Sequence, residues 1–363
     1  AVFWMWISAL LGMCTKFSEV TLAVHFHERN ANGDLVGGPM YYIKNGLKKH
    51  WHWLAYLFSA FGVLTVFGTG NATQVNTITT AIDSALYNYD IISKESASTF
   101  NLIIGIVLAA LIALILLGGI KRIASVSQIV VPFMAVAYFV FALILIICNI
   151  TKVPAAVVTV VQGAFHPRAV TGGVVGSMFV AMQNGVARGI FSNEAGLGSA
   201  PIAAAAAQTH EPVRQGLVSM TGTFIDTIVI CTLTGLSIVL TGAWQVDGLE
   251  GVQVTTYAFQ NGLPFPHVVS SFVLMMCLVF FAFTTILGWD YYSERCLEYL
   301  TGGNMKKVMV FRWIYILAVF IGPYMTVSAV WTIADIFNGL MALPNMIALF
   351  ALNGVVVYGT KKF

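Results

Sequence analysis

Two ionisable residues, Arg188 and Glu194, lie in the middle of an apolar stretch of the chain. Glycines recur around them, at Gly185, Gly189, Gly196 and Gly198. Charged side chains are unfavourable on a helix that faces lipid, and irregular backbone at membrane depth is tolerated only where protein encloses it or where it lines a cavity. Residues 185–199 therefore predict a broken helix, with two half-helices that meet near Gly189 to Asn193.

A break of this kind presents both signs of partial charge to a small solute. The first half-helix would end in free carbonyls near Ala187 to Ile190, which suit a cation or an ammonium group. The second would begin near Asn193 to Gly196 with free amides, which suit a carboxylate. The side chains of Phe191 and Ser192 add the means to enclose a zwitterion. The alternative is a glycine-rich kink that serves only helix packing.

Polar residues inside two other apolar segments are further candidates. The adjacent hydroxyls of Thr284 and Thr285 offer hard oxygen ligands to a small cation, although such hydroxyls also bond to carbonyls one turn earlier. Trp289 shares a helical face with Thr285 and either walls a pocket or belongs to an aromatic belt. Gln74 either binds a solute or bonds to a neighbouring helix.

The other intramembrane charges allow more than one role. Lys16 and Glu19 are three residues apart on one helix, and we expect them to pair. Asp226 has no obvious local partner and is either a structural hydrogen-bonding group or a protonatable one. Arg188 and Glu194 flank the break and can bridge it as a gate. The chain contains no Walker loop, nucleophile elbow or Cys–His cluster, so nothing supports an ATP-driven pump or a membrane enzyme.

The composition indicates an all-α, polytopic membrane protein. Of the 363 residues, 58% are hydrophobic and only 9% are charged, whereas a soluble domain has about 25% charged residues. The net charge of +3 is too small to suggest a nucleic-acid partner. The five cysteines are scattered without metal-ligand spacing, which indicates free thiols.

Hydropathy predicts nine crossings of the lipid bilayer, the fifth of them broken: residues 1–24, 51–84, 101–118, 128–149, 173–207, 216–242, 265–291, 307–324 and 341–359. The segments after odd-numbered crossings carry most of the Lys and Arg residues, including Lys48, Lys121 and Lys306, whereas the other side has only Lys94, Lys152 and Arg168. Positive residues favour the cytoplasmic side. We therefore expect the first helix to run inward and the C-terminus to be cytoplasmic.

Short motifs recur in the same order in both halves of the chain. Met13, Phe17 and Glu19 are echoed by Met220, Phe224 and Asp226, and the motif around Pro132 by that around Pro344. The linker 119–127 is basic, but its counterpart 326–338 has no Lys or Arg, so matching linkers are expected on opposite sides. This predicts inverted repeats over residues 1–150, with four of five helices, and 151–363. The missing first broken helix predicts an N-terminal truncation.

Three motifs resemble signatures of the alanine or glycine:cation symporters, and the resemblance extends over essentially the whole chain. They are Ala1–Gly12, Gly37–Ile43 and Ser192–Pro201. The resemblance implies a transporter of a prokaryotic inner membrane with the LeuT-like five-plus-five inverted fold. It also implies sodium-coupled symport of small amino acids, such as alanine and glycine, by alternating access. The family's N-terminal helix and first broken helix are absent, so this chain alone is not expected to transport.

The resemblance also assigns roles to individual residues. It implies substrate contacts or pocket walls at Gln74, Gly189, Ile190, Phe191, Ser192, Asn193, Gly196 and Trp289, and sodium ligands at Thr284 and Thr285. A glycine-lined pocket walled by Phe191 and Trp289 would favour small solutes. A proton-coupled carrier or a sodium-independent exchanger, using Asp226 and Glu194, is the alternative, and a channel through the break is a further one.

Overall fold

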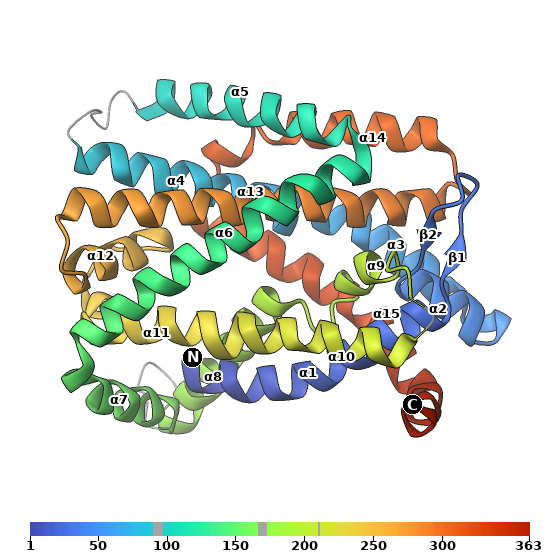
Figure 1. Ribbon diagram of the computed structural model, residues 1–363, viewed down its shortest axis with the longest axis horizontal. Coiled ribbons are helices and arrows are strands. Elements are labelled where there is room, and N and C mark those ends of the chain that lie inside the picture. The colour runs from blue at the N-terminus through green and yellow to red at the C-terminus, as the bar shows by residue number, and fades with distance from the viewer. Residues whose placement is uncertain (90–96, 166–172, 210) are drawn as a thin grey trace.

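The computed structural model describes residues 1–89, 97–165, 173–209 and 211–363. Within these ranges the regular structure is helical apart from a two-stranded antiparallel sheet, β1 (Glu28–Arg29) and β2 (Leu35–Val36). Most of the long helices run along the longest axis of the molecule, and α6 crosses them obliquely (Figure 1). The prediction of an all-α protein is confirmed.

Helices of the first half have the following bounds: α1 (Val2–His25), α2 (Pro39–Gly46), α3 (Trp53–Thr65), α4 (Thr73–Asn88), α5 (Ala97–Leu116), α6 (Gly119–Cys148) and α7 (Val153–Phe165). Those of the second half are α8 (Gly173–Asn193), α9 (Ala200–Ala204), α10 (Pro212–Thr223), α11 (Cys231–Leu240), α12 (Val252–Gly262), α13 (His267–Leu300), α14 (Met305–Ala318) and α15 (Val327–Lys362). Two π-helical segments, η2 (Val66–Ala72) and η4 (Phe224–Ile230), join α3 to α4 and α10 to α11.

In the described part of the chain, seven helical stretches are long and apolar enough to cross a membrane: Val2–His25, Lys49–Asn88, Thr99–Leu116, Gly119–Cys148, Pro212–Leu240, His267–Leu300 and Val327–Lys362. Their positions match seven of the nine predicted crossings. The other two predicted crossings correspond to the α8–α9 pair and to α14, which has 14 residues, whereas a straight crossing needs about 20. The protein is therefore a polytopic membrane protein, and the count of nine stays a prediction.

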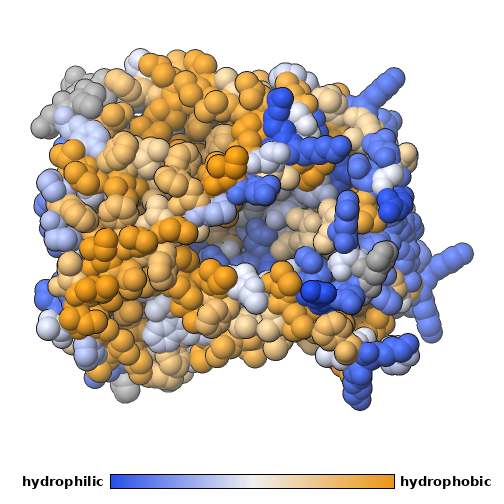
Figure 2. All heavy atoms as spheres, in the orientation of Figure 1, coloured by the Kyte–Doolittle hydropathy of each residue, from blue (hydrophilic) through white to orange (hydrophobic). Residues whose placement is uncertain are grey.

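The outer surface has the apolar character that lipid contact requires. Large apolar side chains are exposed along the membrane-spanning helices, including Ile129 and Phe133 of α6 and Phe350 of α15. Figure 2 shows apolar side chains over much of the visible face, while hydrophilic residues gather at one end. That end carries the hairpin, α2 and the C-terminus (Figure 1).

The hydrophilic end is held together by polar contacts around the hairpin. The Lys44 ammonium lies 2.8 Å from Glu28 Oε1, and the Asn45 amide donates to the same oxygen at 2.8 Å. Partial burial raises the pKa of Glu28, but these two donors outweigh it and hold the pKa below its ordinary value. The other side of the membrane, to which the sequence assigns Lys94, Lys152 and Arg168, is described less completely, because Lys94 and Arg168 lie outside the described residues.

Two segments that the sequence suggested as linkers are helical. Residues 119–127 form the first turns of α6, and residues 327–338 of the segment 326–338 form the first turns of α15. This prediction was wrong because both segments extend helices that already carry strong apolar patterns. The correction matters for the site, since it places Trp331 and Asp335 on a helix that faces the broken segment.

Candidate functional site

The helix break lies later than predicted. α8 is continuous through Gly189 and ends at Asn193, and the irregular segment runs from Glu194 to Ser199. Gly189 did not end the helix because a glycine inside a helix is tolerated at a modest cost. Instead, the chain turns where Glu194, Gly196 and Gly198 adopt positive φ angles of 57°, 90° and 81°. Such angles are readily accessible to glycine and strained for other residues.

Most polar backbone groups of the break are satisfied inside the protein. The Ala195 amide donates to Asn193 Oδ1 at 2.9 Å, and the Gly198 amide donates to Glu19 Oε1 at 3.1 Å. The second half-helix, α9, has only five residues. The prediction of free amides near Asn193 to Gly196 is therefore wrong for Glu194, whose amide donates to the Ile190 carbonyl, and for Ala195. A solute near the break would meet side chains as well as backbone.

A buried network ties the break to three other helices. Asn345 of α15 donates to Glu19 Oε1 at 2.5 Å and to the Gly196 carbonyl at 2.9 Å, and it accepts a hydrogen bond from the Tyr42 hydroxyl of α2. Glu19, Tyr42 and Asn345 are all fully buried. One amide side chain thus connects α1, α2, α15 and the broken segment.

Lys16 and Glu19 do not form the expected ion pair. No Lys16–Glu19 contact within 4.0 Å occurs among the ion pairs of the described residues. Glu19 is engaged by Asn345 and Gly198 instead, and buried Lys16 lies in the electrostatic range of Glu19, Glu194 and Asp226. Lys16 therefore serves as a shared counter-charge to three acids, of which Glu19 is fully buried and Glu194 and Asp226 are partly exposed.

A cavity of about 410 Å³ lies beside the break and brings together residues from six parts of the chain. Its lining comprises Met5, Thr69, Gln74, Arg188, Phe191, Ser192, Glu194, Asp226, Cys231, Thr285, Trp289 and Trp331. We call it the central cavity. Of the residues singled out from the sequence as substrate or sodium contacts, it contains Gln74, Phe191, Ser192, Thr285 and Trp289. Its size falls in the range of small-molecule sites, roughly 300–1,000 Å³.

The π-helical segments shape two walls of the central cavity. In η2 and the start of α4, the Gln74 amide donates to the Thr69 carbonyl at 3.0 Å, five residues earlier. In η4, Asp226 Oδ2 accepts from the Ser192 hydroxyl of α8 at 2.7 Å. A π-helical turn shifts the helical register and is frequent at functional sites, and here it brings Thr69 and Asp226 to the cavity.

Arg188 lies over the cavity between an acid and two aromatic rings. Its Nη2 forms an ion pair with Asp335 of α15, and its guanidinium lies 4.4 Å from the centre of the Trp331 ring. The Phe191 and Trp331 rings lie 4.7 Å apart. The sequence suggested a bridge from Arg188 to Glu194, but the ion pair connects Arg188 to α15. Glu194 instead accepts from the Ser199 hydroxyl at 2.7 Å.

Other predicted site residues lie outside the central cavity. Ile190 and Gly196 line a separate apolar cavity of about 440 Å³ between α1, α8 and α15. Gly189 packs on α1 near Ser8, and Asn193 is buried, with its amide donating to Thr227 at 3.0 Å. Among the residues that the structure describes, no glycine lines the central cavity. The expectation of a glycine-lined pocket is therefore wrong, because the glycines serve the turn and the helix contacts.

The two adjacent threonines of α13 face different surroundings. The Thr285 hydroxyl lines the central cavity and donates to the Phe281 carbonyl at 2.8 Å. The Thr284 hydroxyl donates to the Phe280 carbonyl at 2.9 Å, and its oxygen lies 3.9 Å from Met134 Sδ of α6. Back-bonding uses the hydroxyl hydrogen and leaves oxygen lone pairs free, so Thr285 keeps the ability to ligate a cation at the cavity.

Several lining residues were not singled out from the sequence: Met5, Thr69, Cys231 and Trp331. Thr69 had a signal, because it belongs to the polar run from Gly68 to Gln74. Met5, Cys231 and Trp331 are unremarkable residues within apolar helices. Only the packing of α1, α11 and α15 around the break brings them to one place.

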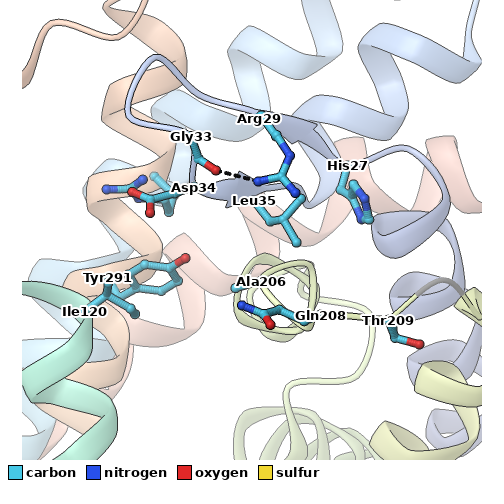
Figure 3. Close-up of a pocket in the computed structure, with 11 residues that line it drawn as sticks. His27, Arg29, Gly33, Asp34, Leu35, Ile120, Ala206, Gln208, Thr209 and Tyr291 are labelled. Carbon is cyan, nitrogen blue, oxygen red and sulfur yellow. Dashed lines mark hydrogen bonds between the residues drawn. The ribbon is translucent and has the colours of Figure 1, made fainter.

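A second polar cavity, of about 660 Å³, opens at the hydrophilic end. Figure 3 shows that the hairpin forms one wall, where the Arg29 guanidinium donates to the Gly33 carbonyl, and that Gln208 and Thr209 lie opposite. Asp34, in the turn between β1 and β2, belongs to the same hairpin wall, and Tyr291 of α13 lies on a further side. We call it the vestibule. None of the residues singled out as substrate or sodium contacts lines it.

Comparisons with known proteins support the interpretation of this chain as a transporter. A sequence profile described as "Sodium:alanine symporter family" matches residues 1–363. An "Uncharacterized transporter" of Haemophilus influenzae is 51% identical, and the match covers 100% of this chain and 76% of that protein. The sodium/alanine symporter AgcS of Methanococcus maripaludis is 44% identical (100% and 77%), and the "Probable sodium/glutamine symporter GlnT" of Bacillus subtilis is 37% identical (100% and 72%). The chain belongs to the sodium:alanine symporter family of transporters.

Proposed function

We propose that this protein carries a small amino acid across a prokaryotic inner membrane together with sodium, by alternating access. The observation that carries the proposal is the central cavity, which places acidic, basic and aromatic side chains beside a broken membrane helix. The names of two similar relatives, AgcS and GlnT, describe sodium-coupled carriers of alanine and glutamine. The proposed substrates are alanine and glycine, bound as zwitterions.

The charges of the cavity suit a zwitterion. Nη1 of Arg188 is buried without a hydrogen-bond partner, and a substrate carboxylate satisfies that donor. Glu194 and Asp226 also line the cavity and attract the ammonium group. The two poles thus come from side chains rather than from helix ends alone. Phe191, Trp289 and Trp331 enclose the apolar part of the solute.

The charge balance around the break favours an accompanying cation. Lys16 and Arg188 face four carboxylates, those of Glu19, Glu194, Asp226 and Asp335. A zwitterionic substrate does not change this balance, whereas a sodium ion reduces the excess of negative charge. Thr285 contributes a hard oxygen ligand of the kind that small cations prefer. The resemblance implies the same role for Thr284, but its hydroxyl faces Met134 rather than the central cavity, so we propose Thr285 alone as the ligand at the cavity.

Helix neighbours support the inverted repeat over residues 1–150 and 151–363. Counterparts in the two halves lie side by side, namely α1 with α10, α4 with α13, and α5 with α14. Figure 1 shows each pair running in opposite directions, as a pseudo-two-fold axis in the membrane plane requires. α6 and α15 each contain the echoed proline, Pro132 or Pro344. This arrangement fits a LeuT-like fold and its alternating access.

The hydrophilic end is the proposed cytoplasmic side. Lys48 and Lys49 follow α2, Lys306 and Lys307 begin α14, and Lys361 and Lys362 end α15. Figure 2 shows hydrophilic side chains gathered at that end. Cytoplasmic loops carry an excess of Lys and Arg. The C-terminus is then cytoplasmic, and the vestibule is the inner opening through which solute leaves.

Uptake by proteoliposomes tests the proposed function. The purified full-length protein should accumulate labelled alanine when an inward sodium gradient is imposed. Equal accumulation with potassium in place of sodium would overturn sodium coupling. Accumulation driven by a pH gradient without sodium would favour the proton-coupled carrier. Counterflow of alanine without a sodium or pH gradient would favour an exchanger. A flux that does not saturate with alanine would favour a channel.

Replacing one threonine at a time separates the sodium ligand from its neighbour. Thr285→Val removes a hydroxyl that lines the central cavity, so we expect the sodium concentration for half-maximal uptake to rise about tenfold, which is a loss of about 1.4 kcal/mol. Thr284→Val is the matched control and should change it little, because that hydroxyl faces Met134. Uptake against sodium concentration measures both. Equal shifts for the two variants would contradict the assignment of Thr285.

The Arg188–Asp335 ion pair should matter to uptake more than to folding. Both side chains are about one-third or more exposed, and such pairs contribute roughly 0–1 kcal/mol to stability. Asp335→Asn should therefore leave the thermal unfolding midpoint almost unchanged but reduce alanine uptake, because Arg188 loses the partner that holds it over the cavity. The reversed pair Arg188→Asp with Asp335→Arg should restore part of the folded geometry but not alanine binding. Normal uptake by Asp335→Asn would show that the pair is dispensable.

A further inference from the structure

Asp290 is an unusual carboxyl group that the proposed substrate and sodium contacts leave unused. It lies on α13 with 0% of its surface exposed, and neither carboxylate oxygen has a hydrogen-bond partner. Buried polar side chains are almost always hydrogen-bonded, and an isolated buried carboxylate is normally neutralised rather than left charged. The position of Asp290 therefore calls for a bound positive charge.

The groups around Asp290 do not supply that charge. One turn further along α13, Glu294 is already engaged by Arg312 of α14, which donates from Nε at 2.5 Å and from Nη2 at 2.8 Å. With Asp290 included, these three side chains carry one cation against two carboxylates. Arg312 and Glu294 are the charged groups within electrostatic range of Asp290 among the described residues.

Polar groups of α14 and η2, which both pack on α13, are also poor donors to Asp290. On α14, the Tyr315 hydroxyl is in electrostatic range, but it already lies 2.9 Å from both the Gly70 and the Ile286 carbonyls. On η2, the Asn71 amide nitrogen donates to the Tyr315 carbonyl at 3.0 Å, and its oxygen is buried without a partner. A shortage of donors and a surplus of acceptors favour a carboxyl group that carries its own hydrogen.

We propose that Asp290 is a proton-binding site, occupied in this conformation, whose proton is transported as an additional coupled ion. The inference rests on the proposed function, since it concerns the coupling of the same carrier. When water reaches Asp290, the O–H bond breaks, the electron pair stays on the carboxylate and the proton passes to water. The reverse step on the other side of the membrane restores the neutral acid.

The link from Asp290 to the substrate runs through its neighbour Trp289, which lines the central cavity. Trp289 packs directly on the backbone of η2, where a Cβ on Gly70 would lie 2.3 Å from Trp289 Cβ. A π-helical, glycine-containing segment is a common place for a helix to bend. Movement of η2 away from Trp289 would therefore change the cavity and admit water to Asp290 in one step.

Infrared spectroscopy of the full-length protein in lipid tests the occupied state directly. At neutral pH, the wild type should show a protonated-carboxyl C=O band that is absent from Asp290→Asn. Asp247→Asn, which removes an exposed acid just after the short helix η5 (Ala243–Gln245), is the control and should leave the band unchanged. Asp290→Glu should shift the band rather than remove it. A band that persists in correctly folded Asp290→Asn would overturn the proposal. If Asp290→Asn does not fold, the shift of the band in Asp290→Glu serves as the test instead.

Transport measurements test the coupling separately from the occupancy. At a fixed sodium gradient, an inward gradient of one pH unit should raise alanine accumulation by up to about tenfold in the wild type, for one coupled proton. It should not raise accumulation by Asp290→Asn, which should still respond to sodium. Equal responses to the pH gradient would show a purely structural carboxyl and overturn the coupling. Absence of any sodium-driven uptake by the wild type would overturn the proposed function, while the infrared band would still report on Asp290.

Discussion

Gly70→Ala is expected to destabilise the protein by about 3 kcal/mol and to abolish alanine binding. An added Cβ would lie 2.3 Å from Trp289 Cβ and 2.8 Å from Trp289 Cγ, both far inside normal contact distance. Trp289 is buried and its Cβ is fixed to α13, so it cannot turn away. The η2 backbone must move instead, which also weakens the hydrogen bond from the Tyr315 hydroxyl to the Gly70 carbonyl.

Gly288→Ala is the matched control for this substitution. Gly288 also lies within a membrane helix, next to Trp289, but a Cβ there would meet nothing within 4 Å. It should keep wild-type stability and binding, with a gain of up to about 1 kcal/mol from the reduced freedom of the unfolded chain. Detergent unfolding curves and alanine-binding isotherms measure both variants. Similar behaviour of the two would show that η2 adapts to the added methyl group.

Asn345→Leu is expected to have a comparable effect through hydrogen bonding rather than through packing. It removes the donor to Glu19 and to the Gly196 carbonyl, and the acceptor of the Tyr42 hydroxyl. The Gly196 carbonyl and the Tyr42 hydroxyl then lose this partner, at roughly 1–3 kcal/mol for each group left unpaired, while Glu19 Oε1 keeps the Gly198 amide. We expect a loss of about 4 kcal/mol and a disordered break, with alanine binding lost as well.

Glu19→Gln separates the contribution of the hydrogen-bond network to stability from the contribution of the negative charge of Glu19. Glutamine keeps an oxygen that can accept from the Gly198 amide, so the loss of stability should be smaller than for Asn345→Leu. Unfolding midpoints and protease accessibility of the Glu194–Ser199 segment provide the comparison. If Glu19→Gln is as damaging as Asn345→Leu, the contribution of Glu19 comes from its charge near Lys16 rather than from the hydrogen bonds.

The sequence allowed the long helices and the existence of the break to be predicted, because both depend on local signals. An apolar run of sufficient length defines α1 within a few residues, whereas α6 begins nine residues before the predicted crossing 128–149 and α13 ends nine residues after the predicted crossing 265–291. The combination of Arg188, Glu194 and four glycines marked the break. The predicted location of the break was several residues too early, because the sequence shows where glycines occur but not which of them adopts a positive φ angle.

The composition of the cavity was less accessible from the sequence, since it depends on packing between distant helices. Thr284 and Thr285 are indistinguishable by spacing, yet only one of them faces the central cavity. Trp331 lies in a segment that looked like a linker and reaches the site only because α15 begins at Val327. The pairing of Arg188 with Asp335, rather than with nearby Glu194, likewise depends on how α15 crosses α8.

Asn345 also imposes a mechanical condition on any transport cycle. Because it holds Glu19 of α1, Tyr42 of α2 and Gly196 of the broken segment at once, none of these can be displaced alone without rupturing a buried hydrogen bond. A tilt of α2 would therefore move Asn345 through the Tyr42 hydroxyl, and Asn345 would in turn pull on the Gly196 carbonyl of the broken segment. A displacement at the hydrophilic end, where α2 lies, would thus also displace the broken segment.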